Sequence, residues 1–166
     1  MELSACIVVY NGCDEALKAA QTVLHCTRRY PVTLYLVDNA SPDGTGKKLE
    51  RTRFEKPVTV ICLSENVGFG KGHNTVLPRL KSKYHFVLNP DILVEEDTLT
   101  GMCAWMDEHP DVKAIYPIHM NPVVRETARE ILGDDERIHI IEPMDVLDFH
   151  NFLSRSYLIL TDSGGI

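Results

Sequence analysis

The sequence alternates between short apolar runs and helical or turn-rich stretches, and this alternation constrains the fold more than any other feature. The first run, SACIVVY, is short, apolar and rich in β-branched residues, and the runs VTLYLVD, VTVICL and YHFVLN follow it. A continuous apolar run such as the first is typical of a strand that is covered on both faces. Because helical stretches separate these strands, the sequence predicts βα units. The expected fold is therefore α/β, with a mostly parallel sheet and flanking helices.

Capping residues set the expected helix bounds. Asp14 is expected to cap the first helix, with Leu17, Ala20 and Leu24 on one side. A polar helix is expected to end near Arg53. Further helices are expected at residues 71–80, from about 95–97 to 109, at 122–132 with Gly133 as its C-cap, and at 145–155. Later strands are expected in the runs KAIYPI, RIHII and YLILT.

Bulk composition narrows the class of protein. The chain has 166 residues, 44% of them hydrophobic, and a net charge of −7. Because the sequence has no clustered excess of lysine and arginine, it argues against nucleic acid as a partner. No apolar run approaches the roughly 20 residues that span a bilayer, and the start of the chain lacks a signal-peptide pattern. We therefore expect a cytoplasmic protein whose membrane contact, if it has one, is not encoded here.

The cysteines and the lysines are spread unevenly along the chain. The five cysteines include no CxxC pair, which argues against a disulfide framework or a zinc site. Every cysteine and every lysine precedes residue 114. This shift in composition suggests a boundary, with one domain at 1–113 and a second segment at 114–166.

Polar clusters follow each of the first four predicted strands. They are Tyr10-Asn11, Asp38-Asn39, the loop from Glu65 to Asn74, and Asn89-Pro90-Asp91. In open α/β sheets, ligands bind beyond the carboxyl ends of the strands. These clusters are therefore expected to meet in space.

The chemistry of the clusters suits a phosphorylated ligand. Asp38 can accept hydrogen bonds, and glycines 68, 70 and 72 let the backbone approach a bulky ligand. Lys71 favours an anion, and Asp91 offers hard oxygen for Mg²⁺ or Mn²⁺. Each residue taken singly has another explanation. Asp38 could be a turn residue, Lys71 a solvated surface charge and Asp91 a residue at the start of a helix. Their combination favours binding.

Four blocks in the first part of the chain resemble a known family. IVVYN, LVDNASPDGT, SENVGFGKGHN and FVLNPDILVEED are similar, in order and spacing, to the signature blocks of family-2 glycosyltransferases, in particular the rhamnosyltransferase-like branch. The resemblance covers residues 1–113. It implies a Rossmann-like GT-A fold, a UDP- or dTDP-sugar donor, Mg²⁺ or Mn²⁺ as cofactor, and inverting sugar transfer in cell-wall polysaccharide synthesis.

The same resemblance implies a set of site residues. The nucleotide-sugar pocket would be lined by Tyr10, Asn11, Asp38, Asn39, Gly68, Lys71, Asn74 and Asn89, with Asp91 as metal ligand. Asn89 stands where the family's metal-binding motif has its first aspartate, which leaves one carboxylate from that motif.

The resemblance does not identify the catalytic base or the acceptor-binding region of a family-2 glycosyltransferase. The family's catalytic base lies in its second half, and residues 95–97 follow the metal loop too closely to supply it. The catalytic residues and the acceptor glycan therefore stay unassigned. The donor-binding part is expected to be incomplete for catalysis, and the alternative is a non-catalytic nucleotide-sugar binder.

Residues 114–166 resemble a second family. The run from AIYPIHMNPVVRETAREIL to YLILTDSGG is similar to part of the C-terminal Rossmann-like domain of bacterial non-hydrolysing UDP-N-acetylglucosamine 2-epimerase. The resemblance implies that His119 faces the substrate diphosphate and sugar, and that Ser163, Gly164 and Gly165 hold the UDP phosphates. Phe149 would lie near the uracil. His119 also fits an ordinary strand-end histidine.

The two resemblances together predict a chimera. A truncated glycosyltransferase would be fused in frame to a truncated epimerase piece, whose terminal glycine loop is cut. Epimerase function would then need a partner to supply the missing domain. Because the second segment must pack against surfaces it did not evolve to meet, we expect faster hydrogen exchange after residue 113 than before it.

Overall fold

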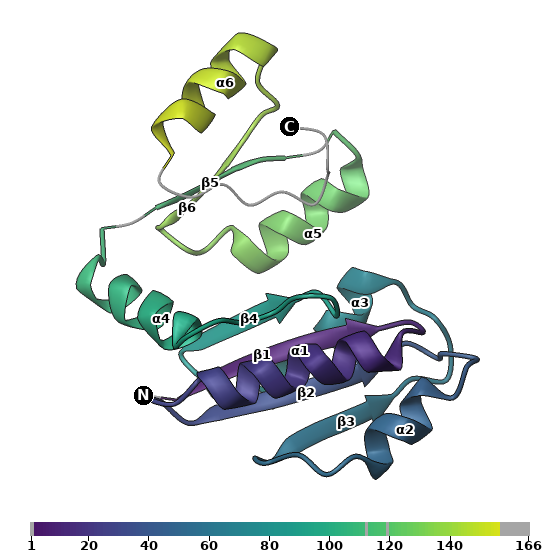
Figure 1. The fold of residues 1–166 in the computed structure, drawn as a ribbon. Helices are drawn as coiled ribbons and strands as arrows, with labels where there is room; N and C mark the ends of the chain where they lie inside the picture. Colours follow the sequence, from purple (N-terminus) through teal and green to yellow (C-terminus); the bar gives the residue numbers. More distant parts are fainter. Residues whose placement is uncertain (1, 112, 119, 157–166) are drawn as a thin grey trace. The chain divides into compact units, whose positions relative to one another are not determined.

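The structure of the chain is a computed structural model that describes residues 2–111, 113–118 and 120–156 (Figure 1). Among the predicted features, His119, the strand at 157–161, Ser163, Gly164 and Gly165 lie outside these ranges. The chain divides into two compact units, Met1–Glu108 and His109–Ile166.

The first unit is built on a four-stranded parallel sheet, as the sequence predicted. Its strands are β1 (Leu3–Val9), β2 (Val32–Asp38), β3 (Val58–Cys62) and β4 (Tyr84–Leu88). Their order in the sheet is β3-β2-β1-β4, and every neighbouring pair is parallel. From β1 the chain moves outward to β2 and β3, then returns to add β4 on the other side. Between β1 and β4 the strand order therefore reverses, which is where open sheets place ligands.

Helices cover both faces of this sheet (Figure 1). They are α1 (Cys13–Cys26), α2 (Thr45–Arg51), α3 (Phe69–Asn74) and α4 (Thr98–Glu108), with a short 3₁₀ turn at Leu77–Arg79. The prediction that Asp14 caps α1 is wrong. Gly12, in the left-handed region at φ 74°, is the N-cap residue, and Asp14 lies in the first turn, where a carboxylate suits the helix dipole.

Two helix predictions differ from the structure. The helix expected at 71–80 begins at Phe69, ends at Asn74 and is followed by the 3₁₀ turn. Pro78 explains this end, because it has no N–H to donate to the carbonyl four residues earlier and its ring clashes there. The helix expected from 95–97 begins at Thr98. Before it, buried Val94 is held against α1, with its N–H donating to Thr22 Oγ1 at 3.1 Å.

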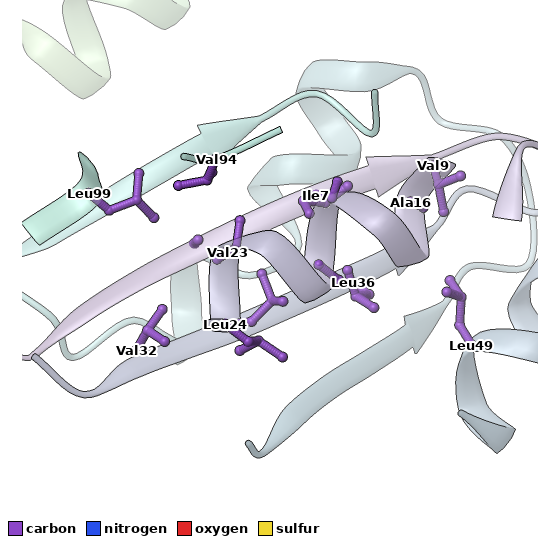
Figure 2. Packing of buried hydrophobic residues seen from close by; sticks show 14 of the residues in the cluster. Ile7, Val9, Ala16, Val23, Leu24, Val32, Leu36, Leu49, Val94 and Leu99 are labelled. Carbon is purple, nitrogen blue, oxygen red and sulfur yellow. The ribbon is translucent and has the colours of Figure 1, made fainter. Parts of the chain in front are cut away.

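The larger core lies between the sheet and α1 (Figure 2). It joins side chains of β1 and β2 to those of α1, the segment after β4, and α4, including Ile7, Leu36, Val23, Leu24, Val94 and Leu99. Alternate residues of the same strands point to the opposite face, where a smaller cluster holds Cys6, Val8, Tyr35, Val37 and Val76. β1 and β2 are thus buried on both faces, which explains the continuous apolar runs of these two strands, whereas β3 and β4 are only partly buried.

The second unit has two parallel strands and two helices. They are β5 (Ala114–Pro117), α5 (Pro122–Leu132), β6 (Ile138–Ile141) and α6 (Val146–Arg155), close to the predicted bounds. Asn121 caps α5 by accepting from the Val123 N–H at 3.0 Å, and Asp145 caps α6. Gly133 stands at the end of α5, as predicted. Among the described residues, no helix is long and apolar enough to cross a membrane.

Candidate functional site

The carboxyl ends of β1 to β4 lie at one edge of the first unit, because the four strands are parallel. We call this edge the rim, and it carries residues 10–12, 38–41, 63–74 and 89–91. All of the residues predicted for the nucleotide-sugar and metal sites of the first part lie in these four segments. The fold therefore brings them to the same edge of the sheet, as the sequence predicted.

Asn39 joins two of the rim segments to each other and to the end of β1. Its N–H donates to the Val9 carbonyl at 2.8 Å, at the end of β1. Its side-chain amide donates to Asn66 Oδ1 and its Oδ1 accepts from the Val67 N–H, both at 2.9 Å. Asn66 Oδ1 in turn accepts from the Gly68 N–H at 2.9 Å. Asn39 is buried, so it fixes the glycine-rich loop relative to β1 and β2.

Asp38 lies beneath the rim surface, with 5% of the residue exposed. Its carboxylate accepts from the Ser41 N–H at 3.4 Å. A Cβ at Gly46 would lie 2.5 Å from Asp38 Oδ2, so α2 can approach this carboxylate only with a glycine there. The carboxylate thus organises the turn after β2, and its contact with a base or ribose stays a prediction.

The turn after β1 is fixed by a residue that sequence reasoning missed. Ser41 Oγ accepts from the Asn11 N–H at 2.8 Å and so ties the β1 segment to the β2 segment. Asn11 and Ala40 both have left-handed backbone, at φ 61° and 60°. Alanine rarely adopts this conformation, and such strain persists only where the surroundings impose it. The turn-rich stretch 39–46 was the available signal, but it does not single out Ser41.

The glycine-rich loop becomes α3, which lies close against β1. Lys71 and Asn74 are exposed on it, whereas Gly72 is buried. A Cβ at Gly72 would lie 2.8 Å from Val8 Cγ1, so glycine permits this close approach. Gly68 precedes the helix with left-handed backbone at φ 83°. Lys71 is therefore placed at the rim by the packing of its own helix.

His73 is a second feature of α3 that sequence reasoning did not single out. It is 5% exposed, and its ring meets Phe69 edge to face at 4.4 Å between centroids. Neither ring nitrogen has a hydrogen-bond partner. Burial, with a smaller contribution from His85, lowers the pKa of His73 to about 4. A helix-face histidine beside three glycines gave no sequence signal for this burial.

The predicted metal ligand stands on the segment after β4. Asn89 and Asp91 are both exposed there, and Leu88 pairs with Ile7 of β1. The strands leading to Asp38 and Asn89 are two spacings apart, roughly 10 Å. Among the described residues, no three His, Cys, Asp or Glu side chains cluster as a metal site. One carboxylate fits Mg²⁺ or Mn²⁺ only if a ligand's phosphates share the cation.

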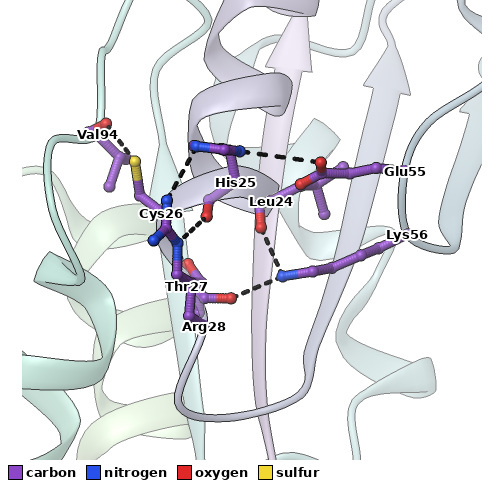
Figure 3. Close-up of polar contacts among 8 residues, drawn as sticks. All are labelled: Leu24, His25, Cys26, Thr27, Arg28, Glu55, Lys56 and Val94. Carbon is purple, nitrogen blue, oxygen red and sulfur yellow. Dashed lines mark hydrogen bonds and ion pairs between the residues drawn. The ribbon is translucent and has the colours of Figure 1, made fainter.

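Two hollows of about 320 and 490 Å³ lie near the end of α1, and His25 lines both. There Lys56 Nζ donates to the carbonyls of Leu24 and Thr27 at 2.6 and 2.7 Å (Figure 3). Because α1 runs back from the rim, this end lies at the amino edge of the sheet. Neither hollow contains a predicted site residue. Ligands of open parallel sheets bind at the other edge, so we place the candidate site at the rim.

Comparison with known families identifies the second half of the chain. A family model described as UDP-N-acetylglucosamine 2-epimerase matches residues 84–166, which is half of the chain. The chain belongs to the UDP-N-acetylglucosamine 2-epimerase family. The UDP-N-acetylglucosamine 2-epimerase of Bacillus subtilis is 58% identical over 59 residues, or 36% of this chain. The chain covers 16% of that relative's length. The predicted epimerase resemblance of residues 114–166 is confirmed.

Solved structures of other proteins resemble the fold. S. aureus TarS 1–349 in complex with UDP-GlcNAc is 25% identical, with a TM-score of 0.53 over 74% of this chain and 36% of that TarS chain. The mannosyltransferase PcManGT of Pyrobaculum calidifontis is 22% identical, with a TM-score of 0.59. The match covers 76% of this chain and 38% of the PcManGT chain. Both likenesses extend over more of the chain than either unit alone. They confirm the α/β architecture with its mostly parallel sheet.

Proposed function

We propose that the chain binds UDP-N-acetylglucosamine at the rim of the first unit. The observation that supports this most is the agreement between the two comparisons. The epimerase family is named for this nucleotide sugar, and TarS, which shares the fold, was solved in complex with it. The first unit is, in this proposal, a GT-A domain of the family-2 glycosyltransferase type. Residues 114–166 are an epimerase-type segment joined to it.

The rim residues supply the binding chemistry in this proposal. Tyr10, with 52% of the residue exposed, and the adjacent Asn11 would contact the base. Lys71 would pair with the diphosphate, because an ammonium group favours an anion. Asp91 would hold Mg²⁺ or Mn²⁺ together with the diphosphate oxygens. The cation would supply positive charge where the leaving group of a sugar transfer becomes negative.

A second candidate function is epimerisation at C2 of the same sugar. The high identity to the B. subtilis enzyme over 59 residues favours it. The residues that would act on the diphosphate there, His119, Ser163, Gly164 and Gly165, are proposed from the family resemblance. This chain covers about a sixth of that relative's length, so the activity would also need the parts of the enzyme that lie outside the match.

Isothermal titration of the full chain tests the binding proposal. UDP-GlcNAc should bind more tightly than dTDP-glucose, and Mn²⁺ should strengthen the binding. Lys71→Ala should weaken UDP-GlcNAc binding by roughly tenfold or more, because a charge-assisted hydrogen bond is lost. Lys81→Ala, an exposed lysine outside the rim, is the matched control and should bind as the wild type does. Absence of binding at millimolar UDP-GlcNAc would defeat the proposal.

Two further experiments test the metal ligand and the epimerase activity separately. Asp91→Ala should abolish the gain from Mn²⁺, whereas Glu95→Ala, exposed in the same segment, should keep it. Equal gains in both variants would remove Asp91 as the metal ligand. Chromatography of UDP-GlcNAc after incubation with the chain tests the second candidate. Formation of the C2 epimer by the chain alone would make epimerisation the primary function.

A further inference from the structure

His73 is a buried residue of α3, the short helix that contacts β1. It follows Gly72, whose lack of a side chain lets α3 approach Val8 of β1. The imidazole is 5% exposed and stacks edge to face on Phe69, and both Nδ1 and Nε2 lack hydrogen-bond partners. A buried polar ring with two unpartnered nitrogens costs stability that an apolar ring would not. The position therefore carries a polar group for which packing alone gives no reason.

The sheet face beneath α3 offers His73 no negative charge. From β4, His85 faces it, and burial lowers the pKa of His85 as well. His85 Nδ1 shares a 2.7 Å hydrogen bond with Ser4 Oγ of β1. The cluster on this face holds two further titratable groups, Cys6 and Tyr35. Burial raises the pKa of the Cys6 thiol to about 12 and keeps it neutral, and the Tyr35 hydroxyl donates to the Arg79 carbonyl at 3.4 Å. Within the described residues, no carboxylate contributes to the pKa of His73.

A proton on His73 would therefore place a cation in an apolar layer with no counter-charge. Burying an unpaired charge costs far more than burying a neutral ring. The only relief is movement of the ring into water, and His73 cannot leave unless α3 leaves β1. Lys71 and Asn74, which lie on the same short helix, would move with it.

We propose that His73 is a positioning residue that holds α3 at the rim as a neutral imidazole, and that its protonation releases α3 and weakens ligand binding there. The release of α3 stands on the packing described above, and the effect on ligand binding rests on the proposed function. The protonation state of His73 thus determines whether α3 holds Lys71 at the rim.

The sign of the effect follows from the two protonation states. The pKa of His73 is lowered from 6.5 to about 4 when α3 is docked. Between these values the released state binds a proton and the docked state does not, so docking weakens as pH falls below about 6.5. The full difference corresponds to a shift of about 300-fold in the docking equilibrium, which is approached only below the docked-state pKa of about 4.

Hydrogen exchange of the full chain tests the release. Protection factors for residues 69–76, corrected for intrinsic exchange rates, should fall up to tenfold per pH unit between pH about 6.5 and about 4.5. His73→Leu and His73→Gln should both remove this slope, and the neutral amide of Gln guards against a Leu variant that misfolds. His25→Gln, at an exposed histidine of α1, is the control and should keep the slope.

UDP-GlcNAc titration over the same pH range separates the two proposals. Wild-type affinity should fall together with the protection of α3, while His73→Gln should lose this pH dependence. A slope in exchange without any UDP-GlcNAc binding would support the release and defeat the proposed function. A pH-independent protection factor in the wild type would overturn the inference. So would an unchanged slope in His73→Gln, because another group would then carry it.

Discussion

The two units share one pattern of alternating strands and helices, yet they bury very different amounts of apolar surface. In the first unit, both central strands are hidden between helical layers, and Ile7, Leu34 and Leu36 are fully buried. Among the described residues of the second unit, Ile118 and Ala128 are the buried apolar ones. Two apolar side chains of α6, Val146 and Leu147, are 72% and 78% exposed.

The difference shows that alternation alone does not make a core. A strand is buried on both faces only when strands flank it and helices cover it, as they do for β1 and β2. The sheet described in the second unit has two strands, and two paired strands are marginally stable alone. Stability should therefore be concentrated in the first unit.

The largest expected change in stability comes from comparing a leucine-to-alanine substitution in the first unit with one in the second. Leu36→Ala should lower the free energy of unfolding of the first unit by about 2–5 kcal/mol, because it opens a cavity in the core (Figure 2). Leu147→Ala, on exposed α6, should change it by less than about 0.5 kcal/mol. Urea denaturation followed by circular dichroism measures both. Equal losses would show that the units form one cooperative core.

A smaller effect is expected where α3 touches the sheet. Gly72→Ala should destabilise the first unit by about 1–3 kcal/mol, because the new Cβ would lie 2.8 Å from the stiff Val8 side chain. Gly70→Ala in the same helix is the control, since nothing lies within 4 Å of its Cβ. It should be neutral or stabilising, because alanine favours helix. Thermal unfolding of the two variants compares them directly.

Hydrogen exchange measures the contrast between the units without substitutions. Amides of β1 and β2 should be protected at least about tenfold more than those of β5 and β6, a difference of about 1.4 kcal/mol. The reason is the burial of β1 and β2 on both faces. Mass spectrometry of the peptides that cover these strands gives the ratio. Uniform protection across residues 108–114 would contradict both the burial contrast and the chimera prediction.

The smallest effect concerns the far end of α1. Lys56→Met should cost about 1 kcal/mol, because two carbonyls at the helix terminus lose a charged donor (Figure 3). Methionine keeps most of the apolar stem. Lys47→Met, an exposed lysine of α2, should cost less than about 0.5 kcal/mol. A loss confined to the first unit in denaturation curves would show that α1 belongs to that unit's cooperative transition.

The sequence predicted the strands and their common direction because β-branched apolar runs are a local signal. It was wrong about where α1 and α4 begin and where α3 begins and ends. The start of α1 depended on the left-handed backbone of Gly12, and the start of α4 followed the docking of Val94 on α1. These are packing effects between segments far apart in sequence, which local propensity does not contain.

The rim was predicted from strand ends, and the structure gathers those segments at one edge. Two of its features were not foreseeable. Ser41 joins two turns through a single hydrogen bond, and His73 faces inward on α3. Neither residue type signals such a role in a polar or glycine-rich stretch. Asn39 was predicted from its position, but its hydrogen bonds to the loop of Asn66 depend on the distance between two strands.

The clearance between Gly72 and Val8 also bears on how this sequence can diverge. A residue larger than glycine at 72 requires a shift of its surroundings while valine stands at 8, because its Cβ would lie 2.8 Å from Val8 Cγ1. A side chain at 72 should be tolerated in a background with a smaller residue at 8, such as Val8→Ala. The two sites are therefore expected to show reciprocal epistasis, and drift in the glycine-rich loop is coupled to the central strand of the sheet.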